Sequence, residues 1–143
     1  MIWMHRISIW SFCVLGVYQI GLGAYFVAVR PALLPEDIRL IGAPTPLGLE
    51  PWLDLVFTVM GGQMAAVGVL IVAFASRILC QSRRRRIDVL LLGLAGLLSA
   101  GLMSGVNFAL GSDFKWLLVV PAALWVAAIA LAAAAPVELI PVS

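Results

Sequence analysis

The stretch FTVMGGQMAAVG, residues 57–68, places one amide side chain, Gln63, within an otherwise apolar run. It also carries three glycines, although a helix interior is more stable with alanine or leucine. Both features suit a helix in lipid, where small residues let helices approach closely and polar groups join them. This stretch therefore predicts a membrane protein, and the rest of the chain is considered on that basis.

The composition supports this interpretation. The 143-residue chain is 64% hydrophobic and only 11% charged, and its mean hydropathy is +1.12. Soluble domains carry roughly a quarter charged residues and about half apolar ones. A soluble domain of this length would not bury so much apolar surface, because small domains expose a large share of their chain. We expect one membrane domain over residues 1–143.

Four apolar stretches are long enough to cross a bilayer, which takes roughly 20 helical residues. They cover residues 7–29, 53–76, 87–110 and 114–135, with an outer loop at 30–51. The first is longer than a signal-peptide core, so we expect it to be retained. All four should be helices, because an open strand in lipid leaves its backbone amides unpaired. The expected fold is an all-α, integral-membrane four-helix transmembrane bundle.

The outer loop is rich in proline, which forbids one continuous helix there. Within it, PEDIRLI (residues 35–41) predicts a short surface helix, because Pro35 suits a first helical turn. In the fourth span, Pro121 should kink or loosen the helix.

The arginines set the expected orientation. Basic clusters beside a membrane helix mark the cytoplasmic side, and QSRRRR (residues 81–86) joins the second and third spans. Both termini are then cytoplasmic, and we expect a multi-pass protein of the bacterial inner membrane. Six basic residues lie inside (Arg6, Arg77, Arg83, Arg84, Arg85, Arg86) and three outside (Arg30, Arg39, Lys115). Because such arginines serve topology, no nucleic-acid partner is expected.

Small residues form one stripe on each span, since positions three, seven or eleven apart share a helix face. Such stripes predict close helix packing in lipid. The stripes are Gly16, Gln19 and Gly23; Asp54, Thr58, Gly61, Ala65 and Gly68; Gly93, Gly96, Ala100, Ser104, Asn107 and Gly111; and Ala123, Ala127, Ala130 and Ala134.

Two amides, Gln19 and Gln63, lie near the expected midplane, where an unpaired amide costs several kcal/mol. We place Gln63 at the border of its stripe, within reach of a neighbouring helix. One interpretation is an interhelical hydrogen bond, with Gln19 as a candidate partner. The other is that Gln63 orients a lipophilic ligand or lines a polar path.

A second polar group lies towards the outer side and supplies further candidate ligand or interhelical contacts. An Arg30–Asp54 pair at the interface is geometrically plausible. Interfacial charges also serve simply as helix anchors, and both roles remain open. The members of the group are Arg30, Asp54, Thr58, Ser104, Asn107, Asp113 and Lys115.

The sequence lacks the usual signs of catalysis, so we expect no catalytic residue, no metal site and no cofactor. His5 is the only histidine, and Cys13 and Cys80 are too far apart for a CxxC motif. No carboxylate lies deep in a span, which argues against a proton-coupled pump. There is no phosphate-binding loop and no nucleophile elbow.

The layout resembles the small bacterial four-helix membrane proteins called DoxX-like. The resemblance covers most of the chain and rests on GVYQIGLGAYF (16–26), RPALLPEDIRLIG (30–42) and VMGGQMAAVGVL (59–70). It implies a four-helix membrane bundle. The arginine–aspartate pair of some relatives has no counterpart at residues 61–64, so no functional residue is carried over.

Three function classes follow. The first is a non-enzymatic bundle, an accessory subunit that binds a lipophilic ligand or partner helices. The second is a small oligomeric transporter or channel with a polar path through Gln19, Gln63 and Asn107. The third is an enzyme acting on a lipid or quinone, for which no chemistry is visible. Expected partners are membrane lipid and either a membrane-protein partner or further copies of the chain.

The proposed orientation is testable by labelling Arg84→Cys in a chain without Cys13 and Cys80. An impermeant thiol reagent added to intact cells should not react, because the arginine-rich connection faces the cytoplasm. Labelling after the membrane is opened is the positive control. Ready labelling in intact cells would overturn the orientation.

Overall fold

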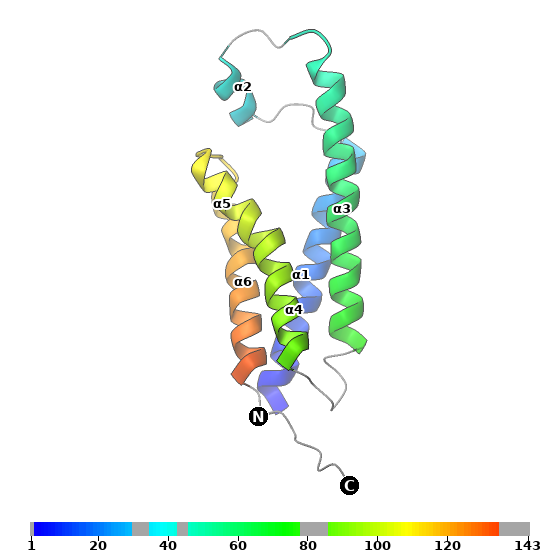
Figure 1. Ribbon diagram of the computed structural model, residues 1–143, viewed down its shortest axis with the longest axis vertical. Coiled ribbons are helices and arrows are strands. Elements are labelled where there is room, and N and C mark those ends of the chain that lie inside the picture. Colours follow the sequence, from blue (N-terminus) through cyan, green and yellow to red (C-terminus); the bar gives the residue numbers. More distant parts are fainter. Residues whose placement is uncertain (1, 30–34, 43–45, 78–85, 135–143) are drawn as a thin grey trace.

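The computed structural model describes residues 2–29, 35–42, 46–77 and 86–134 (Figure 1). Over these residues the chain forms helices and no strand. The elements are α1 (Ile2–Val29), α2 (Pro35–Ile41), α3 (Leu49–Arg77), α4 (Arg86–Gly96), the π-helical turn η1 (Leu97–Gly101), α5 (Leu102–Ala109) and α6 (Lys115–Ala134). The predicted all-α fold class is confirmed.

Four helical stretches are long and apolar enough to cross a membrane. They are Arg6–Val29, Leu49–Arg77, Ile87–Ala109 and Lys115–Ala134, close to the four predicted spans. They alternate in direction, so the start of α1, the end of α3, the start of α4 and the end of α6 share the lower end in Figure 1. The helix α2 lies at the opposite end and matches the predicted PEDIRLI helix.

The contact between α1 and α3 depends on two pairs of glycines. Gly16 faces Gly68 and Gly23 faces Gly61, and the pairs lie seven residues apart on both helices. A Cβ added to Gly16 would lie 2.6 Å from a methyl carbon of Val72 and 2.8 Å from the Gly68 carbonyl oxygen. No side chain fits there, so the two backbones approach closely, as the stripes predicted.

The second partner of α1 is α6. The Ser8 hydroxyl donates a hydrogen bond to the carbonyl oxygen of Ala128 (3.1 Å). One level further along, the rings of Phe12 and Trp125 meet edge to face with centroids 5.7 Å apart. All four residues are buried, and α1 is therefore held by α3 on one side and by α6 on another.

Trp125 also joins α6 to α4. Its indole N–H donates a 3.0 Å hydrogen bond to the carbonyl oxygen of Leu92. The indole occupies space that exists only because residue 96 is glycine, since a Cβ on Gly96 would overlap the ring. A glycine thus creates the notch into which a bulky side chain of the next helix fits.

The turn η1 was not predicted, and it follows directly after Gly96. The buried residues Leu92, Gly96, Ala100 and Ser104 recur every fourth position. In a regular α-helix such a series drifts by roughly 40° per step, because four residues exceed one turn. A wider π-helical turn offsets this drift. It therefore keeps the series directed at α6, with which α4, η1 and α5 are all in contact.

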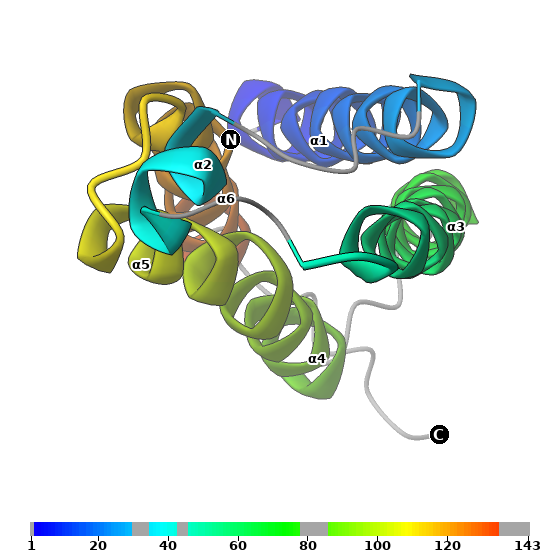
Figure 2. The same ribbon diagram turned by 90° about the horizontal axis from the view of Figure 1, so that it is seen from above.

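The arrangement is more open than the expected bundle. Within the described residues, α3 packs extensively only on α1, whereas α4, η1 and α5 pack on α6 (Figure 2). The largest buried cluster lies where these units meet: Phe12, Leu15, Ile71, Ala75, Leu92, Trp125, Ala128 and Ala132. No helix of the described part of the chain covers the side of α3 opposite α1.

Several sequence predictions need correction. The stripe Ala123, Ala127, Ala130 and Ala134 is exposed, because α6 packs through the opposite side with Trp125 and Ala128. Gly111 lies outside the third span, in a turn at φ 65°, where a residue without a Cβ is favoured. The helix α3 begins at Leu49, before Pro51, since a first turn tolerates proline. The helix α6 continues through Pro121 to Ala134, and the kink expected at this proline stays a prediction.

The glycine contact predicts that Gly16→Ala lowers the free energy of unfolding by about 1–3 kcal/mol, because a Cβ overfills the α1–α3 contact. Gly21→Ala on the same helix is the control, since nothing lies within 4 Å of its added Cβ. That change should be neutral or slightly stabilising. Thermal unfolding in detergent compares the two, and equal melting temperatures would contradict the assigned contact.

Candidate functional site

Gln19 is directed into the protein interior, as its place on the α1 stripe predicted. The residue is only 3% exposed. The structure shows no hydrogen bond between its amide and another described residue. The hydroxyl of the adjacent Tyr18 is also buried and unpartnered within the described part of the chain. Among the described residues, the structure thus shows no partner for these two polar groups in the middle of α1.

Gln63 lies in the opposite environment. It is exposed, on the side of α3 that faces away from α1. At about 100° per residue, it is about 200° around the helix axis from Gly61, which faces α1. The predicted position at the border of the stripe is therefore wrong. The predicted hydrogen bond to Gln19 is also wrong, and Gln63 bonds to no other described residue.

The two amides nevertheless lie at similar depth. The Gly16–Gly68 and Gly23–Gly61 contacts bracket Gln19 on α1 and Gln63 on α3. Gln63 is the central residue of α3, midway between Leu49 and Arg77. A glutamine at this position is too short to reach either end of a helix of this length, so it cannot place its amide in interfacial water.

The remaining predicted polar residues do not converge on one site. The Ser104 hydroxyl donates to the Leu118 carbonyl oxygen (2.7 Å), which makes it an interhelical contact. The Asn107 amide donates to the carbonyl oxygen of Met103 (2.9 Å), one turn back in its own helix. The Thr58 hydroxyl likewise bonds to its own helix, at the carbonyl oxygen of Asp54 (2.8 Å). Arg30 lies outside the described residues, so the Arg30–Asp54 pair stays a prediction.

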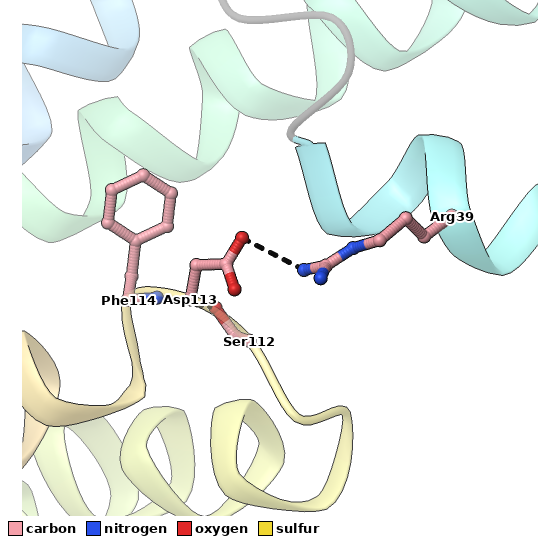
Figure 3. A network of polar contacts seen from close by, with 4 residues as sticks. All are labelled: Arg39, Ser112, Asp113 and Phe114. Carbon is pink, nitrogen blue, oxygen red and sulfur yellow. Dashed lines mark hydrogen bonds and ion pairs between the residues drawn. The ribbon is translucent and has the colours of Figure 1, made fainter.

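An ion pair that the sequence did not predict joins α2 to the turn before α6 (Figure 3). Arg39 Nη2 lies 2.9 Å from Asp113 Oδ2, and the side chains are 59% and 60% exposed. In the same turn, the Ser112 hydroxyl accepts a hydrogen bond from the Phe114 backbone N–H (3.1 Å). The pair marks where α2 meets this end of the molecule, and because it is exposed it contributes little stability to that contact.

The strongest candidate site is the outer face of α3, which we define as Val59, Gly62, Gln63, Ala66, Leu70 and Ala73. These residues share the side of the helix away from α1, and all are exposed. A Cβ at Gly62 would meet nothing within 4 Å, so this surface is open. Gly62 and Ala66 form a small-xxx-small spacing, beside which stands the unpartnered amide of Gln63.

Comparison of the chain with known proteins found no relative. No protein-family model, curated protein or solved structure matches the chain. The DoxX-like resemblance therefore stays a prediction. Among the described residues, no three histidine, cysteine, aspartate or glutamate side chains gather in a way that would hold a metal ion.

The environment of Gln19 predicts that Gln19→Leu keeps or raises stability. A buried amide without a partner costs about 1–3 kcal/mol, and leucine of similar size removes that cost. Ser104→Ala is the contrasting variant, because it leaves the Leu118 carbonyl without its hydroxyl donor and should lower the melting temperature. A marked loss of stability in Gln19→Leu would show that the amide has a partner.

Proposed function

We propose that this protein is a non-enzymatic, four-span membrane protein that binds a partner transmembrane helix on the outer face of α3, as an accessory subunit does. In this proposal both termini are cytoplasmic and the membrane is the bacterial inner membrane. The observation that carries the proposal is the exposed amide of Gln63 at the centre of a span-length helix.

In a membrane, the exposed amide of Gln63 is costly. Facing acyl chains, the Gln63 side chain would have no hydrogen-bond partner, which is unfavourable by several kcal/mol in an apolar medium. Its own chain supplies none within the described residues. A second helix that covers the outer face would supply a donor or acceptor, and such bonds contribute roughly 0.6–2 kcal/mol in membranes.

The shape of the outer face fits the same role. Gly62 and Ala66 leave a shallow surface on which another backbone can approach closely. The flanking side chains of Val59 and Leu70 would pack on either side of the crossing. The expected partner helix carries small residues at its own crossing point and a polar side chain level with Gln63.

The alternative of a transporter or channel receives less support from this geometry. A polar path through one chain would need Gln19, Gln63 and Asn107 to face a common space. Gln19 points inward, Gln63 points outward, and Asn107 bonds within its own helix. A path through these residues would therefore need several chains.

The experiment uses native mass spectrometry on the full chain extracted from its membrane. Wild type should carry a stoichiometric partner, either a second protein or another copy of the chain. Gln63→Leu and Ala66→Leu should reduce the assembled fraction several-fold, because one removes the amide and the other obstructs the crossing. Both should keep the melting temperature of the isolated chain, since neither residue contacts α1.

Ala127→Leu is the matched control, because Ala127 is an exposed alanine on the side of α6 away from its packing partners. It should leave assembly unchanged. A chain that is monomeric in wild type, or an assembly that Gln63→Leu and Ala66→Leu leave intact, would refute helix binding at α3.

A further inference from the structure

A groove lies on the side of α1 away from α3, and it is a second candidate binding site. It encloses about 420 Å³ and is lined by Trp3, Arg6, Ile7, Trp10, Ser11 and Val14 of α1 and by Leu124 of α6. Its volume lies in the range of small-molecule sites, although it is open along one side. None of these residues takes part in the proposed helix-binding face on α3.

The charged and the apolar residues of the groove lie at different ends of it. Arg6 lies near the end of the molecule, and Val14 lies eight residues deeper, about 12 Å along the helix at 1.5 Å per residue. Leu124 of α6 adds apolar surface at the deep end. The groove is thus cationic where a span would meet the lipid headgroups and apolar where it would meet the acyl chains.

The cation in the groove has no counter-charge among the described residues. Arg6 is exposed and forms no ion pair with another described residue, and none of the described residues that line the groove is acidic. The Ser11 hydroxyl already donates to the Ile7 carbonyl oxygen (2.9 Å), so it offers a ligand only acceptor capacity. Trp3 and Trp10, 76% and 71% exposed, flank Arg6 with indole N–H donors and broad apolar rings.

We propose that this groove binds an anionic phospholipid, with the lipid phosphate on Arg6 between the two indoles and an acyl chain along Ile7, Val14 and Leu124. A guanidinium is suited to a phosphate because its fork of donors can bond two oxygens at once. A zwitterionic headgroup fits less well, because the described lining of the groove provides no carboxylate for its ammonium group. In the proposed orientation Arg6 meets the cytoplasmic leaflet, which carries anionic lipid.

The test titrates the purified full chain in neutral detergent with phosphatidylglycerol that carries brominated acyl chains. Quenching of tryptophan fluorescence reports contact, and brominated phosphatidylcholine is the zwitterionic comparison. Wild type should bind phosphatidylglycerol more tightly, and Arg6→Gln should weaken that binding about fivefold or more. Arg77→Gln removes the same charge at the same end of the molecule outside the groove, and it should bind like wild type.

Val14→Phe narrows the deep end of the groove without changing charge and should also weaken binding. The proposal is overturned if Arg6→Gln and Arg77→Gln weaken binding equally, if phosphatidylcholine binds equally well, or if inorganic phosphate competes fully. The proposal rests on membrane placement but not on helix binding at α3. A chain that withstands alkaline extraction from membranes yet shows no preference for phosphatidylglycerol would overturn the lipid site alone.

Discussion

The close approach of α1 and α3 is the constraint on which the rest of the structure depends. Between helices in lipid there is no hydrophobic drive, so contact must come from dispersion over surfaces that fit closely. The pairs Gly16–Gly68 and Gly23–Gly61 provide this fit at two levels. They also fix the rotation of α3 about its axis. Once its glycines face α1, Gln63 must point to the opposite side.

The helix α1 consequently has three sides with different chemistry. One side packs backbone to backbone with α3 through glycines. A second meets α6 through a hydrogen bond from Ser8 and an aromatic contact from Phe12. The third carries the groove with Arg6. The contacts of Ser8 and Phe12 with α6 hold the two helices side by side, and this places Leu124 of α6 in the lining of that groove.

The packing side of a helix was predictable from the sequence where its residues differ clearly in size from their neighbours. The packing sides of α1 and α3 followed from periodicity, because their few glycines contrast with large neighbours. The same reasoning failed for α6, where alanines surround the helix and the buried side is marked by Trp125 instead. Local patterns could not reveal the ion pair between Arg39 and Asp113, which are 74 residues apart. The turn η1 depends on the fit to α6, which no single-helix pattern contains.

The contrast between Gln19 and Gln63 bears most directly on function. Both amides lie at a similar depth, and neither bonds to another described residue. Gln19 is already enclosed by protein, so any free-energy cost of its unpaired amide falls on the folding of the chain itself. We therefore expect a leucine to be tolerated at this position. Gln63 is exposed among the described residues, on a helix whose glycines prevent it from turning inward. No described residue satisfies it, and this is why we propose a partner helix: the open surface around Gly62 and Ala66 suits a helix better than it suits a headgroup at that depth.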